Sequence, residues 1–132
     1  MRHVIFSLIL LVLVSIAVPV HQQQQQQPIY VKITADEAKQ LMDEAEGFIL
    51  LDVRTEVEYQ ESHIEGAILI PDYELAERAP TEVPDKHGII IIYCRSGRRS
   101  ANSAHVLLDM GYTHVYDLGG IIDWPYTTVS GN

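Results

Sequence analysis

The chain is poor in cysteine and in positive charge, and both shortages narrow what it can do. Its 132 residues include one cysteine, Cys94, so no disulfide can form within the chain. Lysine and arginine number 9 against 18 aspartates and glutamates, and the formal net charge of −9 argues against nucleic acid as a partner. The six histidines show no metal-ligand spacing with Cys94, so we expect no metal and no other cofactor. The length allows one ordinary domain and not two.

The longest apolar run lies at the amino end. A short basic start precedes an apolar stretch over residues 4–14, and Ser15 and Ala17 then place small residues at the spacing of a cleavage site. This layout is typical of a secretory signal peptide, so we assign residues 1–20 to a signal peptide or, if it is not removed, an N-terminal anchor. We therefore expect an extracytoplasmic protein, periplasmic or secreted, that touches a membrane only through an uncleaved segment.

A glutamine-rich segment over residues 21–28 follows and is typical of a spacer. From residue 29 to residue 132, short apolar runs alternate with helical patterns, which predicts an α/β domain with a mainly parallel central sheet. We expect strands over residues 29–33, 48–53, 67–70, 89–93 and 114–118, and helices from Thr34 to about Gly47 (with Thr34 and Glu37 as a capping box), over 56–61, around 75–78 and over 100–110. The run over 89–93 does not alternate, which indicates a strand buried on both faces.

The lone cysteine stands where this buried strand ends. It opens the segment Cys94-Arg95-Ser96-Gly97-Arg98-Arg99-Ser100, which leads into a predicted helix. The N–H groups of a first helical turn lack partners, the helix dipole is positive there, and the arginines add positive charge. All three favour the thiolate, which is the reactive form of cysteine. We therefore predict an anion site that contains a nucleophile, rather than the buried core thiol that a lone cysteine more often is.

Several other polar residues need an assignment. Asp52 ends the strand over 48–53, and ligands of parallel sheets bind outside the carboxyl ends of the strands, so Asp52 and Cys94 are expected at one edge. Asp52 and Arg54 either line this edge or support it by capping a turn and pairing, and we favour the supporting role. We interpret Glu56, Glu58 and Glu61 as a solvated helix face, His63 as structural, and Trp124 as packing for the carboxyl-terminal segment.

From about Ile29 to Tyr126 the chain resembles the rhodanese, or sulfurtransferase, family in its single-domain, exported form. The matching pieces are Leu51-Asp52-Val53-Arg54, Glu58-Tyr59, His63-Ile64-Glu65-Gly66-Ala67, the segment from Cys94 to Ser100, and Gly119-Gly120 with Trp124. The resemblance implies a three-layer α/β/α domain and makes Cys94 the catalytic nucleophile. Cys94 would take the outer sulfur of thiosulfate as a persulfide and pass it to cyanide or to a thiol acceptor, which can be a protein.

The resemblance also implies roles for the residues that follow Cys94. Arg95, Ser96, Gly97, Arg98 and Arg99 would form the substrate-binding loop. Arg95 and Arg99 are the expected anion contacts, and Arg98 either contacts the anion or faces solvent. Arg95 directly after the cysteine favours thiosulfate over mercaptopyruvate as the donor.

Phosphatases that share this fold place five residues between their cysteine and arginine. Four residues separate Cys94 from Arg99, and the shorter loop suits a sulfane sulfur better than a tetrahedral phosphate. The alternative function is a persulfide carrier or protein-binding module without turnover. We expect the protein to be a monomer.

Overall fold

The computed structural model describes residues 27–132. The predicted signal or anchor segment, residues 1–20, and nearly all of the predicted spacer lie outside the described residues. Between residues 27 and 132, no helix combines the length and the apolar character needed to cross a membrane.

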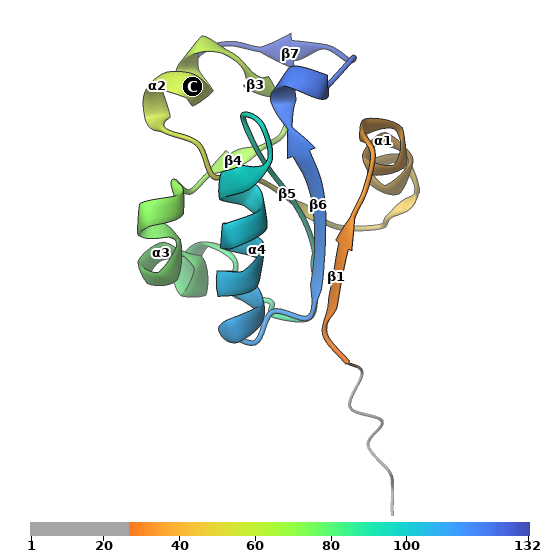
Figure 1. The fold of residues 1–132 in the computed structure, drawn as a ribbon, viewed down its shortest axis with the longest axis vertical. Coiled ribbons are helices and arrows are strands. Elements are labelled where there is room, and N and C mark those ends of the chain that lie inside the picture. The colour runs from red at the N-terminus through yellow and green to blue at the C-terminus, as the bar shows by residue number, and fades with distance from the viewer. Residues whose placement is uncertain (1–26) are drawn as a thin grey trace, which may run out of the picture.

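Five parallel strands form the central sheet. Their order is β1 (Ile29–Lys32), β6 (His114–Gly120), β5 (Ile89–Cys94), β2 (Ile49–Asp52) and β4 (Ile68–Leu69). Helix α1 (Ala35–Glu44) covers one face, and α3 (Leu75–Glu82) and α4 (Arg98–Asp109) cover the other, as Figure 1 shows. The predicted three-layer α/β/α architecture with a mainly parallel sheet is therefore confirmed.

Short helices, turns and strands cover the carboxyl ends of the sheet strands. These are α2 (Glu56–Glu61), the 3₁₀ turns η1 (Asp72–Glu74) and η2 (Ile121–Asp123), and a small antiparallel pair of β3 (His63–Ile64) with β7 (Thr128–Val129). Figure 1 shows α2, β3 and β7 above this end of the sheet. The loop after β5 therefore opens among segments that are distant in sequence.

The strand β5 separates two hydrophobic cores. Ile90, Ile92 and Cys94 pack on the side of α3 and α4, whereas Ile91 and Tyr93 pack on the side of α1. Successive strand residues point to opposite faces, so a strand covered by helices on both sides must be apolar at every position. This confirms the prediction drawn from the absence of alternation. The same alternation places the Cys94 thiol on the face of the sheet that α3 and α4 cover.

The ends of the elements differ from the predicted ones by a few residues. The capping box of α1 forms as predicted, with the Thr34 hydroxyl accepting from the Glu37 N–H and the Glu37 carboxylate accepting from the Thr34 N–H. Helix α3 continues to Glu82, beyond the expected end near residue 78. Arg78 binds Glu74 and Glu82, each at 2.6 Å, and such pairs four residues apart support the added turn. Helix α4 begins two residues earlier than expected, at Arg98.

Candidate active site

Cys94 lies at the carboxyl end of β5, inside the turn that leads into α4. Its side chain belongs to the core beneath α4, and the residue is 1 % exposed. The backbone N–H of Gly97 donates a hydrogen bond to Cys94 Sγ at 3.0 Å. Gly97 is the residue before the first turn of α4 and has φ of +107°, a value that glycine tolerates far better than other residues. An N–H from the start of the helix is thus directed onto the sulfur, although the thiol itself is buried among core residues.

The loop rests on the bare backbone of β6. A Cβ atom on Gly120 would lie 2.3 Å from the carbonyl oxygen of Arg95 and 2.7 Å from Cα of Ser96. The register between β5 and β6 also shifts after Ile92, so that Cys94 pairs with Gly120. The close approach of the loop therefore requires glycine at position 120.

Arg99 forms an ion pair with Glu58 of α2. The two terminal nitrogens of Arg99 donate to the two oxygens of Glu58, at 2.7 and 2.8 Å. The Glu58 carboxylate also accepts hydrogen bonds from the N–H and hydroxyl of Thr55, which form part of the capping box of α2. The Arg99 guanidinium, with Thr55, lowers the pKa of Glu58 to about 2, and Glu58 in turn raises the pKa of Arg99.

This pair corrects the interpretation of the α2 carboxylates as a solvated face. Glu56 and Glu61 are exposed as expected, but Glu58 is half-buried and bound to the loop. It also changes the electrostatics of the site. The charge of Arg99, an expected anion contact, is balanced by Glu58, whereas Arg95 and Arg98 form no ion pair with any residue from 27 to 132.

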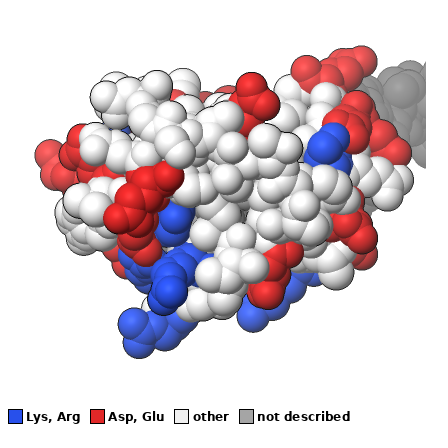
Figure 2. Space-filling view, turned by 90° about the horizontal axis from the view of Figure 1, so that it is seen from above, with Lys and Arg blue, Asp and Glu red and all other residues white. Residues whose placement is uncertain are grey.

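Arg95 and Arg98 are both exposed beside the loop. Figure 2 looks onto this end of the molecule and shows lysine and arginine side chains gathered at one place, with acidic side chains next to them. A groove of about 460 Å³ runs along this side of the loop. Ser96, Gly97 and Arg98 line it together with Asp117, Asp123 and others from β1, α4 and β6. Cys94 does not line this groove, so the groove does not open onto the thiol.

Asp52 and Arg54 form a buried pair with each other. Asp52 is fully buried and Arg54 is 4 % exposed. The Arg54 N–H and side-chain Nε donate to Asp52 at 2.9 and 3.0 Å, so the carboxylate caps the turn and holds the guanidinium. Burial alone lowers the pKa of Arg54, but the hydrogen bonds and charge of Asp52 outweigh it and raise the pKa overall. The guanidinium also donates to the carbonyl of Ser62 at 2.6 Å and so fixes the segment between α2 and β3.

Tyr93 extends this support towards α2 and β3. Its ring lies 5.5 Å from the Arg54 guanidinium, and its hydroxyl accepts from the N–H of Ile64 at 3.1 Å. Burial, and secondarily the charge of Asp52, raise the pKa of Tyr93. Asp52 and Arg54 thus do not line an open edge; they hold together the segments that surround the loop.

His63 and Trp124 take packing positions. The His63 ring stacks on Tyr59 with centroids 3.7 Å apart, and its Nδ1 lies 2.8 Å from the Tyr59 carbonyl oxygen. Trp124 packs against the core under α1 and meets Tyr126 edge-on. Within residues 27–132 no three histidine, cysteine, aspartate or glutamate side chains are grouped for a metal ion.

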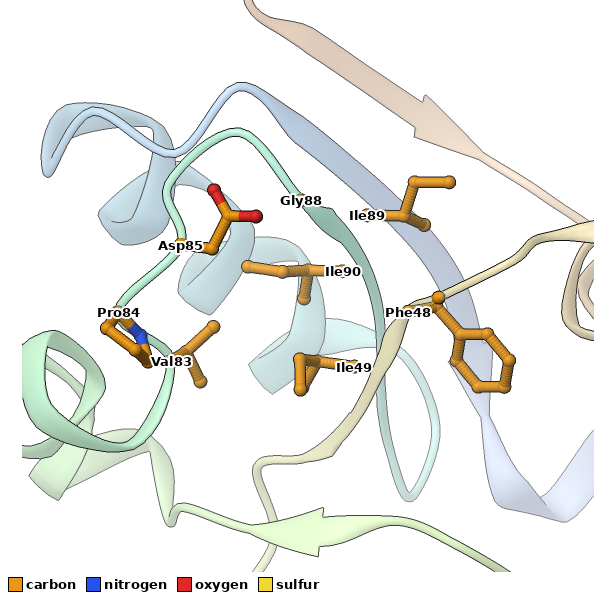
Figure 3. Close-up of a pocket in the computed structure, with 9 residues that line it drawn as sticks. Phe48, Ile49, Val83, Pro84, Asp85, Gly88, Ile89 and Ile90 are labelled. Atoms are coloured by element: carbon orange, nitrogen blue, oxygen red, sulfur yellow. The ribbon is translucent and has the colours of Figure 1, made fainter.

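An apolar pocket lies at the opposite end of the sheet. Figure 3 shows Ile49 at the start of β2 and Ile90 in β5 pointing toward Val83 and Pro84, while Phe48 and Ile89 point to the other side of the two strands. The pocket measures about 260 Å³. It lies at the amino end of β5 while Cys94 lies at the carboxyl end, and four or five residues of extended strand span roughly 15 Å. This pocket is therefore separate from the thiol.

The fold and the loop together define a parallel α/β domain that holds a thiol between a strand end and a helix N-terminus. Comparison with known proteins identifies the family. Residues 34–125 match the rhodanese-like domain, and the chain belongs to that family. It is a rhodanese-type transferase.

Its relatives match more than half of the chain. The thiosulfate sulfurtransferase PspE of Escherichia coli K12 is 44 % identical over 81 residues, which are 61 % of this chain and 78 % of that protein. A sulfurtransferase of Allochromatium vinosum is 35 % identical over 94 residues, 70 % of this chain and 86 % of that protein. The structure of an E. coli rhodanese with anions superimposes with a TM-score of 0.61 and 42 % identity, covering 64 % of this chain and 100 % of that one.

Proposed function

We propose that this protein moves sulfane sulfur from thiosulfate to a thiophilic acceptor through a persulfide on Cys94. The observation that carries the proposal is the position of Sγ, which lies at the end of β5 with the Gly97 N–H directed at it. A relative that is 44 % identical bears the name thiosulfate sulfurtransferase, which supports thiosulfate as the donor.

The chemistry requires no oxidant and no general base. The Cys94 thiolate attacks the outer sulfur of thiosulfate, a new S–S bond forms, and the old S–S bond breaks as sulfite leaves with its electron pair. Cyanide or a thiolate acceptor then attacks the outer sulfur of the persulfide. Thiocyanate or an acceptor persulfide departs, and the electron pair of the cleaved bond returns to Cys94.

The loop supplies the stabilisation that this reaction needs. The persulfide carries negative charge on its outer sulfur, and N–H groups at the start of α4 stabilise that charge without reorganising. Ser96 and Gly97 provide backbone for the loop, and the exposed charges of Arg95 and Arg98 attract the doubly charged donor. Arg99, held by Glu58, positions the loop against α2.

We further propose the domain organisation and location that the sequence indicates. Residues 1–20 serve as a signal peptide or anchor, residues 21–28 as a spacer, and residues 29–132 as a rhodanese-like domain that acts as a monomer outside the cytoplasm. The charge pattern and small residues of the first segment support export. Cell fractionation, with mass measurement of the mature amino terminus, tests this.

The test of the function is thiocyanate formation from thiosulfate and cyanide by the purified protein, beside a Cys94→Ser variant. We expect turnover that disappears in the variant, and a mass gain of one sulfur atom on the wild-type protein after thiosulfate alone. A stable mass gain without turnover would show a persulfide carrier. Absence of both would refute the proposal and leave a binding module.

A further inference from the structure

The three most exposed large apolar side chains of residues 27–132 lie in elements that contact the Cys94 loop or helix α4. Val57 is 67 % exposed, Tyr73 73 % and Ile122 62 %, whereas no other large apolar side chain in this part of the chain exceeds 41 %. A single exposed apolar side chain is ordinary, but several around one site mark a binding surface. We call these three residues the apolar ring.

Each member of the ring belongs to an element that contacts the loop or the helix after it. Val57 lies in α2, next to the Glu58 that binds Arg99. Ile122 lies in η2, and its N–H donates to the carbonyl oxygen of Arg95 at 3.3 Å. Tyr73 lies in η1, which packs against α4. The ring is therefore fixed in position relative to the thiol, although its members are far apart in sequence.

An exposed carboxylate accompanies each apolar side chain. Glu56 precedes Val57, Asp72 precedes Tyr73, and Asp123 follows Ile122, and all three acidic residues are exposed. At each of three places, one exposed apolar side chain therefore stands next to one exposed negative charge. Figure 2 shows acidic side chains standing apart from one another on this end of the molecule, with uncharged surface between them.

We infer that the apolar ring docks the sulfur acceptor, and that this acceptor is a protein whose reactive cysteine is flanked by apolar and basic side chains. The inference rests on the proposed function and names the acceptor class for it. Cyanide and thiosulfate are too small to touch three elements around the loop, so they make no use of the ring. A partner that inserts a cysteine into the loop would cover it, and its lysines or arginines would meet the three carboxylates. The net charge of −9 steers such a partner towards this protein.

Binding is tested with the full-length Cys94→Ser protein and synthetic peptides that carry serine in place of the reactive cysteine. One peptide has tryptophan and lysine around the serine, a second has glutamate for lysine, and a third has glycine for tryptophan. We expect the first to bind at least about tenfold more tightly than the others at low salt, with the margin over the glutamate peptide shrinking as salt rises. Combined Val57→Ala, Tyr73→Ala and Ile122→Ala changes should weaken its binding about tenfold. Val106→Ala, an exposed position in the later turns of α4, is the matched control.

Sulfur transfer is then measured from the thiosulfate-treated wild-type protein to the cysteine forms of the same peptides. We expect the triple variant to slow transfer to the basic apolar peptide about tenfold and to leave thiocyanate formation unchanged. Preferential peptide binding without any persulfide would support the ring and refute the proposed function. If the persulfide forms but all peptides bind and receive sulfur equally, the apolar ring does not dock the acceptor. The same conclusion follows if the triple variant has no effect.

Discussion

Replacing Glu58 with glutamine removes the negative charge that holds Arg99 while keeping the shape of the side chain. Glutamine also serves at this position of a capping box, so the start of α2 retains its hydrogen bonds. The substitution therefore isolates the ion pair between α2 and the loop. We expect it to destabilise the folded protein at neutral pH.

The size of the effect follows from the pKa of Glu58. The pKa falls from an ordinary 4.5 to about 2 in the folded protein, chiefly through Arg99. At about 1.4 kcal/mol per pKa unit this sets an upper limit of roughly 3.5 kcal/mol. The Glu58 side chain is 24 % exposed and Arg99 27 %, so solvent screening reduces the expected loss to about 1 to 2 kcal/mol. For a domain of this size that lowers the Tm by roughly 5 to 10 °C.

The pH dependence has a definite sign. Because the pKa of Glu58 is lower in the folded than in the unfolded chain, the pair stabilises the folded state above about pH 4.5. That contribution is lost as the pH falls towards 2. The free energies of unfolding in urea of the wild type and of Glu58→Gln should therefore differ by a constant amount from pH 5 to 7. The two values should converge as the pH falls towards 2.

The control is Glu61→Gln, which removes an exposed charge from the same helix. We expect its effect on the free energy of unfolding to stay below about 0.5 kcal/mol. If both variants lose equal stability, or if the Glu58→Gln difference persists unchanged at pH 2, the ion pair does not supply the stabilisation described here.

Three further substitutions test other parts of the site. Gly120→Ala places a methyl group against the Arg95 carbonyl oxygen, so we expect kcat/KM for thiocyanate formation to fall more than tenfold with an unchanged circular dichroism spectrum; full activity would show that the loop does not need this contact. Asp52→Asn leaves the buried Arg54 charge without its carboxylate and should cost about 3 to 5 kcal/mol in urea unfolding, and a cost below 1 would contradict the supporting role. Arg95→Ala should raise KM for thiosulfate about threefold to tenfold and leave a neutral trisulfide donor unaffected, and an equal loss on both donors would remove the electrostatic argument.

The strand β5 and its thiol could be predicted because their signals are local. Six consecutive strand residues are apolar in the sequence, and the polar segment that begins after Cys94 marks the strand end without any knowledge of the rest of the chain. The first capping box was equally local, because Thr34 and Glu37 are three residues apart. The unbroken apolar run, its polar end and the capping spacing therefore sufficed to predict the mainly parallel sheet and the position of Cys94.

The partner of Arg99 could not be found in this way. Glu58 lies 41 residues before Arg99, and its neighbours Glu56 and Glu61 make the whole helix look solvated. One signal was available, because Thr55 and Glu58 repeat the capping spacing of Thr34 and Glu37. Strands β3 and β7 have two residues each, too few to show the alternating hydrophobic pattern of a strand. The short elements that cover the loop are therefore formed only by tertiary packing.

The contact between the loop and Gly120 limits how this scaffold can be re-engineered. A chimera that received a longer loop, sized for a tetrahedral oxyanion, would have to fit the added residue where Arg95 and Ser96 already touch bare backbone. The shifted register of β6 beside Cys94 is matched to the present length. Exchange of specificity within this architecture therefore requires grafting the loop and the end of β6 together, as a two-segment cassette.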